Sequence, residues 1–154
     1  MPKIGADAPA LAGPTDLGDF DLSAHRGATV VVFFYPKDMT PGCTTEACAF
    51  RDHRSDLSDA GAVVVGVSRD SVARHARFRG KHDLNFPLVA DEDGAITEAW
   101  GVWQLKKFMG REKMGIVRST FVVGPDGDIT HAWPKVKVKG HAEAVLAAIT
   151  GPAA

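Results

Sequence analysis

Long apolar runs are absent from this sequence of 154 residues, and cysteine is scarce, with only two copies. No stretch approaches the roughly 20 apolar residues that a membrane-spanning helix needs, which argues against a helical membrane protein. Residues 1–7 also lack the apolar core of a secretory signal peptide. We therefore expect a cytoplasmic protein. In that compartment two cysteines are more often catalytic or redox-active than joined in a permanent disulfide.

An excess of charge of one sign is absent too. The formal net charge is -1, so nothing in the composition favours nucleic acid or an anionic membrane surface as a partner. The sequence has no Cys-x-x-Cys, which argues against a disulfide oxidoreductase of that type, and no Gly-x-Ser-x-Gly or phosphate-binding loop. Internal repeats, low-complexity segments and linkers are also missing, so we expect residues 1–154 to form a single domain.

The two cysteines lie five positions apart, where a buried strand passes into a helix. Residues 30–34 form the apolar, β-branched and aromatic run that is typical of a buried strand. Pro36 ends this run, and Thr40-Pro41 is a helix-start signal, with Thr as N-cap and Pro at the first helical position. Cys43 is then the third helical residue. Free backbone N–H groups and the helix dipole favour an anion there, so its thiol should ionise readily and act as a nucleophile.

Strands and helices alternate along the rest of the chain. The helix from Pro41 is predicted to run to about Ala60, and Leu17-Gly18-Asp19-Phe20 is predicted as the turn of an N-terminal hairpin. This order of elements predicts a three-layer α/β sandwich with a mixed central sheet. Further strands are predicted at 62–67, 88–90, 119–123 and 129–133, and further helices from a cap within 68–71 to about 81, at 95–100 and at 142–149.

Several motifs resemble one enzyme family. Pro36-x-x-x-Thr40-x-x-Cys43 matches the active-site motif of peroxiredoxins, and the run from Tyr35 to Cys48 resembles the PrxQ group, also called bacterioferritin-comigratory proteins. The resemblance continues in order through nearly the whole chain. Its other segments are 85–88, 91–94, 100–103, 106–111, 115–121 and 135–141.

This resemblance implies a thioredoxin-like fold with an N-terminal β-hairpin extension. It implies reduction of hydrogen peroxide and organic hydroperoxides by a monomer, with electrons supplied by thioredoxin or a similar dithiol, and neither cofactor nor metal. By the same match Cys43 is the peroxidatic cysteine and Cys48 the resolving one. Thr40 and Arg118 are the polar partners of the peroxide, and Pro36 shields the site.

The residue types suit this chemistry. A guanidinium near a thiol favours the thiolate, and we hypothesise that Arg118 and the Thr40 hydroxyl stabilise charge that develops on the peroxide oxygens. Glu46 stands where many related chains have Gln, so no role is carried over to it.

The spacing of the cysteines predicts a conformational change. Five residues on an ideal α-helix place the two Cα atoms roughly 8.7 Å apart, whereas a disulfide needs them within about 6.8 Å. Cys43 and Cys48 therefore either never bond, or bond only after this part of the helix unwinds. We hypothesise that catalysis alternates between a helical reduced state and a locally unfolded disulfide state.

Two other functions compete with this interpretation. Cys43, Cys48 and His53 recur at intervals of five and could ligate a metal, although that interval does not return to one helix face. A thioredoxin-fold binding or holdase module with incidental cysteines is the non-enzymatic alternative.

Other features are interpreted as structural. The basic residues Arg69, Arg74, Arg77, Arg79 and Lys81 are taken as a solvated helix face. Trp100, Trp103 and Phe108 could line an apolar collar around the peroxide, but core packing is favoured for at least two of them. None of the six histidines is assigned a partner.

Overall fold

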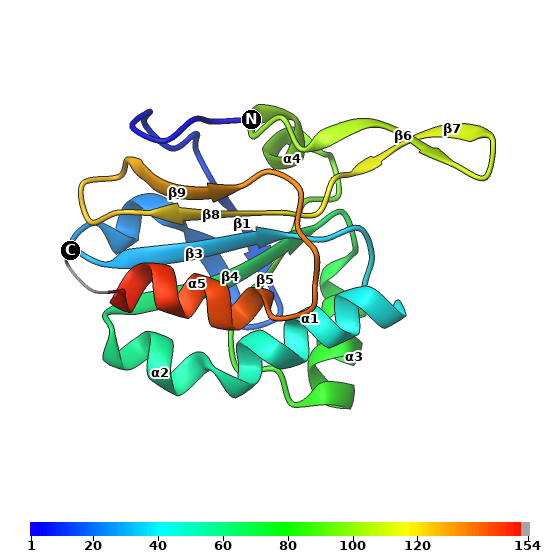
Figure 1. The fold of residues 1–154 in the computed structure, drawn as a ribbon. Helices are drawn as coiled ribbons and strands as arrows, with labels where there is room; N and C mark the ends of the chain where they lie inside the picture. The colour runs from blue at the N-terminus through cyan, green and yellow to red at the C-terminus, as the bar shows by residue number, and fades with distance from the viewer. Residues whose placement is uncertain (152–154) are drawn as a thin grey trace.

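A mixed five-stranded sheet forms the centre of the computed structural model, which describes residues 1–151 (Figure 1). The strands are β1 Ala12–Thr15, β2 Gly18–Asp21, β3 Thr29–Phe34, β4 Ala62–Ser68, β5 Leu88–Ala90, β6 Trp103–Phe108, β7 Arg111–Ile116, β8 Ser119–Val123 and β9 Ile129–Trp133. The α-helices are α1 Pro41–Asp52, α2 Arg54–Asp59, α3 Val72–His82, α4 Ala95–Ala99 and α5 His141–Thr150, and η1 Leu22–His25 is a 3-10 helix.

The sheet has the strand order β5-β4-β3-β8-β9. Strands β3, β4 and β5 run parallel, whereas β8 and β9 pair antiparallel to their neighbours. Successive residues of β3 point to opposite faces, and both faces are buried, which is why the sequence of this strand is apolar without a break. The arrangement confirms the predicted α/β fold class with a mixed sheet and an N-terminal hairpin, β1–β2.

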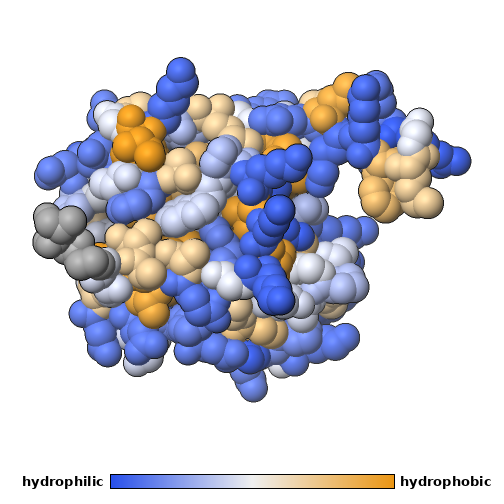
Figure 2. Space-filling view, viewed as in Figure 1, coloured by the Kyte–Doolittle hydropathy of each residue, from blue (hydrophilic) through white to orange (hydrophobic). Residues whose placement is uncertain are grey.

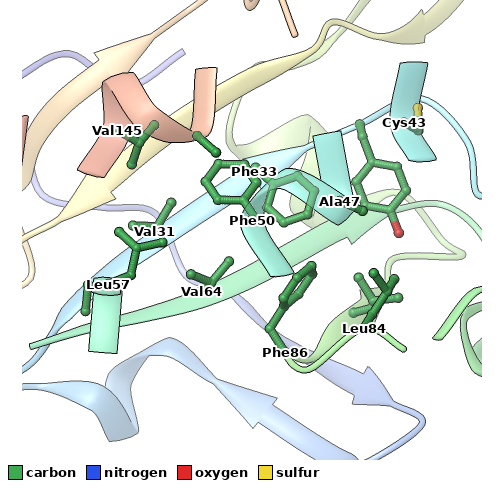
Figure 3. Close-up of a cluster of buried hydrophobic side chains, with 14 of the residues drawn as sticks. Val31, Phe33, Cys43, Ala47, Phe50, Leu57, Val64, Leu84, Phe86 and Val145 are labelled. Carbon is green, nitrogen blue, oxygen red and sulfur yellow. The ribbon is translucent and has the colours of Figure 1, made fainter. Parts of the chain in front are cut away.

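Two cores lie on the two faces of the sheet. The helix-side core packs Val31 and Phe33 of β3 against α1, α2, α3 and α5, and Figure 3 shows Phe33 and Phe50 in its middle and Cys43 at its edge. The hairpin-side core packs the other face of β3 against the β1–β2 hairpin and α4. Its buried members are Leu11, Phe20, Val30, Val32, Phe34, Val65, Val67, Val89, Ile96, Trp100, Val102, Ile116, Phe121, Val123 and Ile129.

Two predicted element boundaries are wrong. The helix predicted from Pro41 to about Ala60 is divided at His53 into α1 and α2. His53 leaves the helical conformation (φ -95, ψ 4), and its ring lies 3.1 Å from Glu143 of α5, so the chain bends where a neighbouring helix holds it. In the N-terminal hairpin, residues 18–20 belong to β2 rather than to the turn, because Thr15 caps the tighter turn through the Leu17 N–H.

The predicted solvated basic face is also partly wrong. Arg69 stacks 3.4 Å above the ring of Trp103, and Arg79 forms a 2.6 Å ion pair with Asp16, in the turn between β1 and β2. Arg79 also donates to the carbonyls of Leu84 and Phe86. Arg79 therefore joins α3 to the β1–β2 turn, and Arg69, in the loop between β4 and α3, contacts β6.

The β6–β7 hairpin was not predicted from the pattern. It projects from the body as a separate two-stranded sheet, with hydrophobic and hydrophilic residues side by side at the upper right of Figure 2. Phe108 and Met109 are 76% and 87% exposed. Trp100, by contrast, is fully buried in the hairpin-side core. Among residues 1–151 no helix is long and apolar enough to span a membrane.

Candidate active site around Cys43

Cys43 occupies the first turn of α1, as the sequence predicts. Thr40 is the N-cap residue in an extended conformation, and Pro41 is the first helical residue. The Cys43 side chain is only 1% exposed, yet its Sγ lies 3.3 Å from Nη2 of Arg118, which donates to it. A guanidinium at this distance stabilises negative charge on the sulfur, and the helix N-terminus adds to the effect.

The sheet brings these two residues together across 75 positions of sequence. Strands β3 and β8 are antiparallel neighbours, and Phe34, the last residue of β3, pairs with Ser119, the first residue of β8. The chain leaves β3 toward α1 at the same end of the sheet where Arg118 precedes β8. Gly42 keeps the approach open, because a Cβ there would lie 3.2 Å from Nη2 of Arg118.

Glu46 is a site residue that the sequence did not identify. It follows Cys43 by three residues, a spacing that puts both side chains on one helix face. Arg118 Nη1 donates to Glu46 Oε1 at 2.8 Å, so one guanidinium contacts both residues. Burial raises the pKa of Glu46 to about 7, against the opposing effect of Arg118. Within residues 1–151 its second oxygen, Oε2, has no hydrogen-bond partner.

Glu46 and Cys43 both favour the charged form of Arg118. Burial alone disfavours the guanidinium cation, but Glu46 and the Cys43 sulfur outweigh it and raise the pKa of Arg118. Arg118 therefore stays a permanent cation at the sulfur, whichever protonation state Glu46 adopts.

Thr40 and Pro36 lie in the loop between β3 and α1. Thr40 occupies the N-cap position, but its side chain does not cap the helix. Its hydroxyl instead donates to the carbonyl of Lys37 at 2.8 Å, which closes a tight turn in front of α1. Pro36 directly follows the buried Tyr35 and is half-buried.

Both cysteines are free thiols on the same helix. Cys48 is half-buried, five residues after Cys43, so the structure has the helical arrangement in which the two sulfurs cannot bond. The alternative metal site is not assembled, because Cys43, Cys48 and His53 do not come together in the part of the chain that the structure describes.

The pattern of the AhpC/TSA family matches residues 4–132. The chain belongs to the AhpC/TSA family. Peroxiredoxin Bcp of Bacillus subtilis (strain 168) is 48% identical to it over 145 residues, which cover 94% of this chain and 92% of that protein. Peroxiredoxins are thiol-dependent peroxidases, so this family member is an oxidoreductase that uses a hydroperoxide substrate and a thiol reductant.

Solved structures of relatives agree with this assignment. "Xanthomonas campestris Peroxiredoxin Q - Structure F4" has a TM-score of 0.87 at 46% identity and covers 94% of this chain and 92% of its own. A second structure of that protein, named LUss, has a TM-score of only 0.77 at the same identity, covering 93% and 90%. Bacterioferritin comigratory protein of the same organism, described for its alkyl peroxide reduction activity, has a TM-score of 0.89 at 44% identity and covers 96% and 98%.

A second cation approaches the active site of this family member from the β6–β7 hairpin. Lys106 donates from Nζ to the carbonyl of Ile116 at 3.0 Å, and Ile116, the last residue of β7, precedes Arg118 by two positions. Burial and the charge of Arg118 lower the pKa of Lys106, and the Cys43 sulfur acts in the opposite direction. No sequence pattern identified this residue, because its position depends on the β6–β7 hairpin, whose residues are mostly exposed.

The hypothetical apolar collar is only partly assembled. Trp100 packs in the core, and its indole N–H donates to the carbonyl of Ala10. Trp103 is half-buried beneath Arg69. Phe108 is the one of the three that stays open to solvent, on the hairpin that also carries Lys106.

Proposed function

We propose that Cys43 is the peroxidatic cysteine of a peroxidase that reduces hydrogen peroxide and organic hydroperoxides. The observation that carries the proposal is the 3.3 Å contact from Arg118 Nη2 to a Cys43 sulfur that is 1% exposed in the first turn of a helix. A guanidinium donor and a helix N-terminus both favour negative charge on a sulfur, and burial separates this sulfur from bulk solvent. The described alkyl peroxide reduction by the Xanthomonas relative supports an organic substrate.

In the first step the Cys43 thiolate attacks the terminal oxygen of the hydroperoxide. The S–O bond forms and the O–O bond breaks, so the sulfur is oxidised to a sulfenic acid and the alcohol, or water, leaves after taking up a proton. Arg118 stabilises the charge that moves from sulfur to oxygen. The Thr40 hydroxyl donates its hydrogen bond to the backbone carbonyl of Lys37. Toward the substrate it therefore offers lone pairs, which accept a hydrogen bond from the hydroperoxide O–H. Pro36 shields the sulfur on the loop side.

In the second step Cys48 resolves the sulfenic acid. Its thiolate attacks the Cys43 sulfur, a disulfide forms, and the hydroxyl of the sulfenic acid leaves as water after protonation. Five residues of α-helix hold the two cysteines too far apart for a disulfide, so the first turns of α1 unwind for this step. The different TM-scores of the F4 and LUss structures of one relative support two conformations in this family.

In the third step thioredoxin, or a similar dithiol, reduces the disulfide by exchange and becomes a disulfide itself. Both cysteines belong to one helix, so the cycle needs no second copy of the chain, and we propose a monomer. A disulfide in an unwound, exposed segment suits attack by an external dithiol.

The test is hydrogen peroxide consumption coupled to thioredoxin and its reductase, with the wild type, Cys43→Ser and Cys48→Ser. We expect full turnover, none, and turnover that stalls unless another thiol resolves the sulfenic acid. Undiminished turnover in Cys43→Ser would refute the proposal and would favour a non-enzymatic module. A crystal of the oxidised protein with residues 43–48 both helical and disulfide-bonded would refute the unwinding step.

A further inference from the structure

A buried polar network lies beside the loop that leads into α1 and takes no part in the chemistry above. We call it the Asp38 network. Both Asp38 and His75 are fully buried, and the network joins the loop to β4 and to α3. Its members are Tyr35, Asp38, Ser68, Asp70, Arg74 and His75.

The hydrogen-bond partners of His75 fix where its protons are. Nε2 lies 3.0 Å from the carbonyl oxygen of Val89, which can only accept, so Nε2 carries a proton. Nδ1 lies 2.6 Å from Oδ2 of Asp38, a distance that requires a second proton between the two atoms. Tyr35 donates to the other oxygen, Oδ1, also at 2.6 Å.

The backbone of Asp38 is held as firmly as its side chain. Its N–H donates to Oδ2 of Asp70 at 2.9 Å, and its carbonyl accepts from Nη2 of Arg74 at 3.1 Å. Ser68 donates to the same oxygen of Asp70, and Arg74 also forms an ion pair with Asp70. Every polar group of Asp38 thus has a partner outside the loop or at its start.

The next residue shows what these contacts maintain. Met39 has a left-handed backbone (φ 64), which is unfavourable for a residue with a long side chain. Such a conformation persists only where the surroundings determine it. Asp38 is pinned on one side of Met39, and on the other side the Thr40 hydroxyl is bonded to Lys37. Cys43 follows only three residues after Thr40.

Asp38, Asp70 and His75 could in principle ligate a metal ion. The contacts argue against this, because hydrogen bonds occupy both oxygens of Asp38 and both ring nitrogens of His75. A 2.6 Å contact between Nδ1 and Oδ2 leaves no space for an ion between them. Hydrogen bonds, and not a metal ion, therefore hold the network together.

We propose that His75 is a positioning residue for Cys43, which acts by holding Asp38 and through it the 36–40 loop. This inference rests on the proposed function of Cys43 and extends it to α3. Residues 43–48 unwind and refold in each cycle. Meanwhile the network holds the 36–40 loop in place, so that α1 begins again at the same position. Cys43 then returns to the same place against Arg118.

Two substitutions of His75 separate its two contacts. In His75→Asn the side-chain amide nitrogen takes the place of Nδ1, so the donor to Asp38 remains and the contact to Val89 is lost. In His75→Gln the amide reaches the place of Nε2, so the donor to Val89 remains and the one to Asp38 is lost. The matched control is His82→Gln, in the last turn of the same helix, where the ring packs on Phe78 away from Asp38.

The primary measurement is the second-order rate constant of reduced Cys43 with hydrogen peroxide, for protein shown to be folded by circular dichroism. We expect His75→Gln to lower it by roughly tenfold or more, and His75→Asn and His82→Gln to stay within about threefold of the wild type. Proton NMR gives a second readout. The wild type should show a far-downfield proton for the short Asp38–His75 contact, which His75→Gln removes and His82→Gln leaves in place.

Equal losses in His75→Asn and His75→Gln, or unchanged rates in both, would overturn the positioning role. The rate of Cys43 alkylation by iodoacetamide separates this failure from a failure of the proposed function. If the wild type consumed no peroxide but His75→Gln still changed the alkylation rate, the peroxidase proposal would fall and the positioning role would stand. If His75→Gln does not fold, Tyr35→Phe carries the test, because it removes only the hydroxyl donor to Asp38. It should lower the peroxide rate constant by about fivefold, and a rate constant within the threefold range of the control would overturn the proposal.

Discussion

The chain is held very differently on the two sides of Cys43. Before it, residues 35–40 are fixed by the Asp38 network, whose partners come from β4 and α3. After it, the side chains of residues 43–48 make hydrogen bonds to only one residue outside α1 in the described chain, which is Arg118. If α1 opens as proposed, we therefore expect the opening to be confined to the helical side of Cys43. The contrast supports a cycle in which the loop before Cys43 stays in place while the first turns of α1 unwind.

Removing Arg118 should have the largest effect, because in the described chain it is the only residue outside α1 that hydrogen-bonds to the side chains of residues 43–48. In Arg118→Ala the sulfur loses its donor, and we expect the rate constant with hydrogen peroxide to fall roughly 100- to 1,000-fold. Glu46 is then left buried without its partner, which should lower the free energy of unfolding by about 3 kcal/mol. Stopped-flow oxidation and urea unfolding measure the two effects.

The double variant Arg118→Ala/Glu46→Gln serves as the control. Neutralising the buried carboxylate should restore most of the stability but none of the peroxide reactivity. If reactivity returned with stability, Arg118 would act through the fold alone and the direct contact to the sulfur would be irrelevant.

The second prediction concerns the pH dependence of stability through Glu46. Burial raises the pKa of Glu46 in the folded chain from 4.5 to about 7, so the folded state binds this proton more tightly than the unfolded state. Its contribution to stability is therefore full below about pH 4.5 and is lost as the pH rises through 7. The loss should approach about 3 kcal/mol.

Glu46→Gln isolates this effect. His141, whose pKa burial lowers to about 4, acts in the opposite direction, since its contribution is lost as the pH falls. The difference in unfolding free energy between the wild type and Glu46→Gln cancels that contribution, and it should change between pH 5 and 8. A constant difference would show that Glu46 stays ionised in its pair with Arg118.

The third prediction concerns Thr40, which lies where the loop held by the Asp38 network meets the first turn of α1. Thr40→Val keeps the shape of the side chain but loses the hydroxyl that donates to Lys37. We expect the peroxide rate constant to fall about tenfold, since the variant loses both the turn contact and the acceptor for the substrate. Thr40→Ser retains the hydroxyl and should stay near the wild type. Equal rates in the Val and Ser variants would remove Thr40 from the mechanism.

Much of the fixed framework could be predicted from sequence, because local patterns report it. The apolar run of residues 30–34 predicts a buried strand, and Thr40-Pro41 predicts where α1 begins. The β6–β7 hairpin escaped prediction because Lys106, Lys107 and Phe108 all face solvent and give no alternation. Its one local signal was Met109-Gly110, where both residues have positive φ as a two-residue hairpin turn requires.

The site residues also divide into those that local motifs predict and those whose roles depend on long-range contacts. Cys43, Thr40 and Arg118 were assigned from motifs, but the role of Glu46 depends on a guanidinium that arrives from 72 positions away. His75 was assigned no partner, because its contact with Asp38 spans 37 positions, with α1, α2 and β4 between the two residues. Buried polar pairs of this kind carry no periodicity, and only the fold reveals them.

The smallest predicted effect concerns how easily the helical side opens. Thr45 is exposed in α1 between the two cysteines. Thr45→Gly and Thr45→Ala both lose its contact to Pro41, and they differ only in helix propensity, by about 1 kcal/mol. Because unwinding precedes disulfide formation in the proposed cycle, the Gly variant should form the Cys43–Cys48 disulfide about fivefold faster than the Ala variant after one equivalent of peroxide. Mass spectrometry of quenched samples follows the reaction.

Ala76→Gly places the same change at an exposed position of α3, on the anchored side. It should cost similar stability and leave the rate of disulfide formation unchanged, since α3 does not unwind in the cycle. Faster disulfide formation in Ala76→Gly would mean that opening extends beyond α1 into the Asp38 network. In that case the two sides of Cys43 would move together, and the anchored loop could not serve as the fixed point from which the helix refolds.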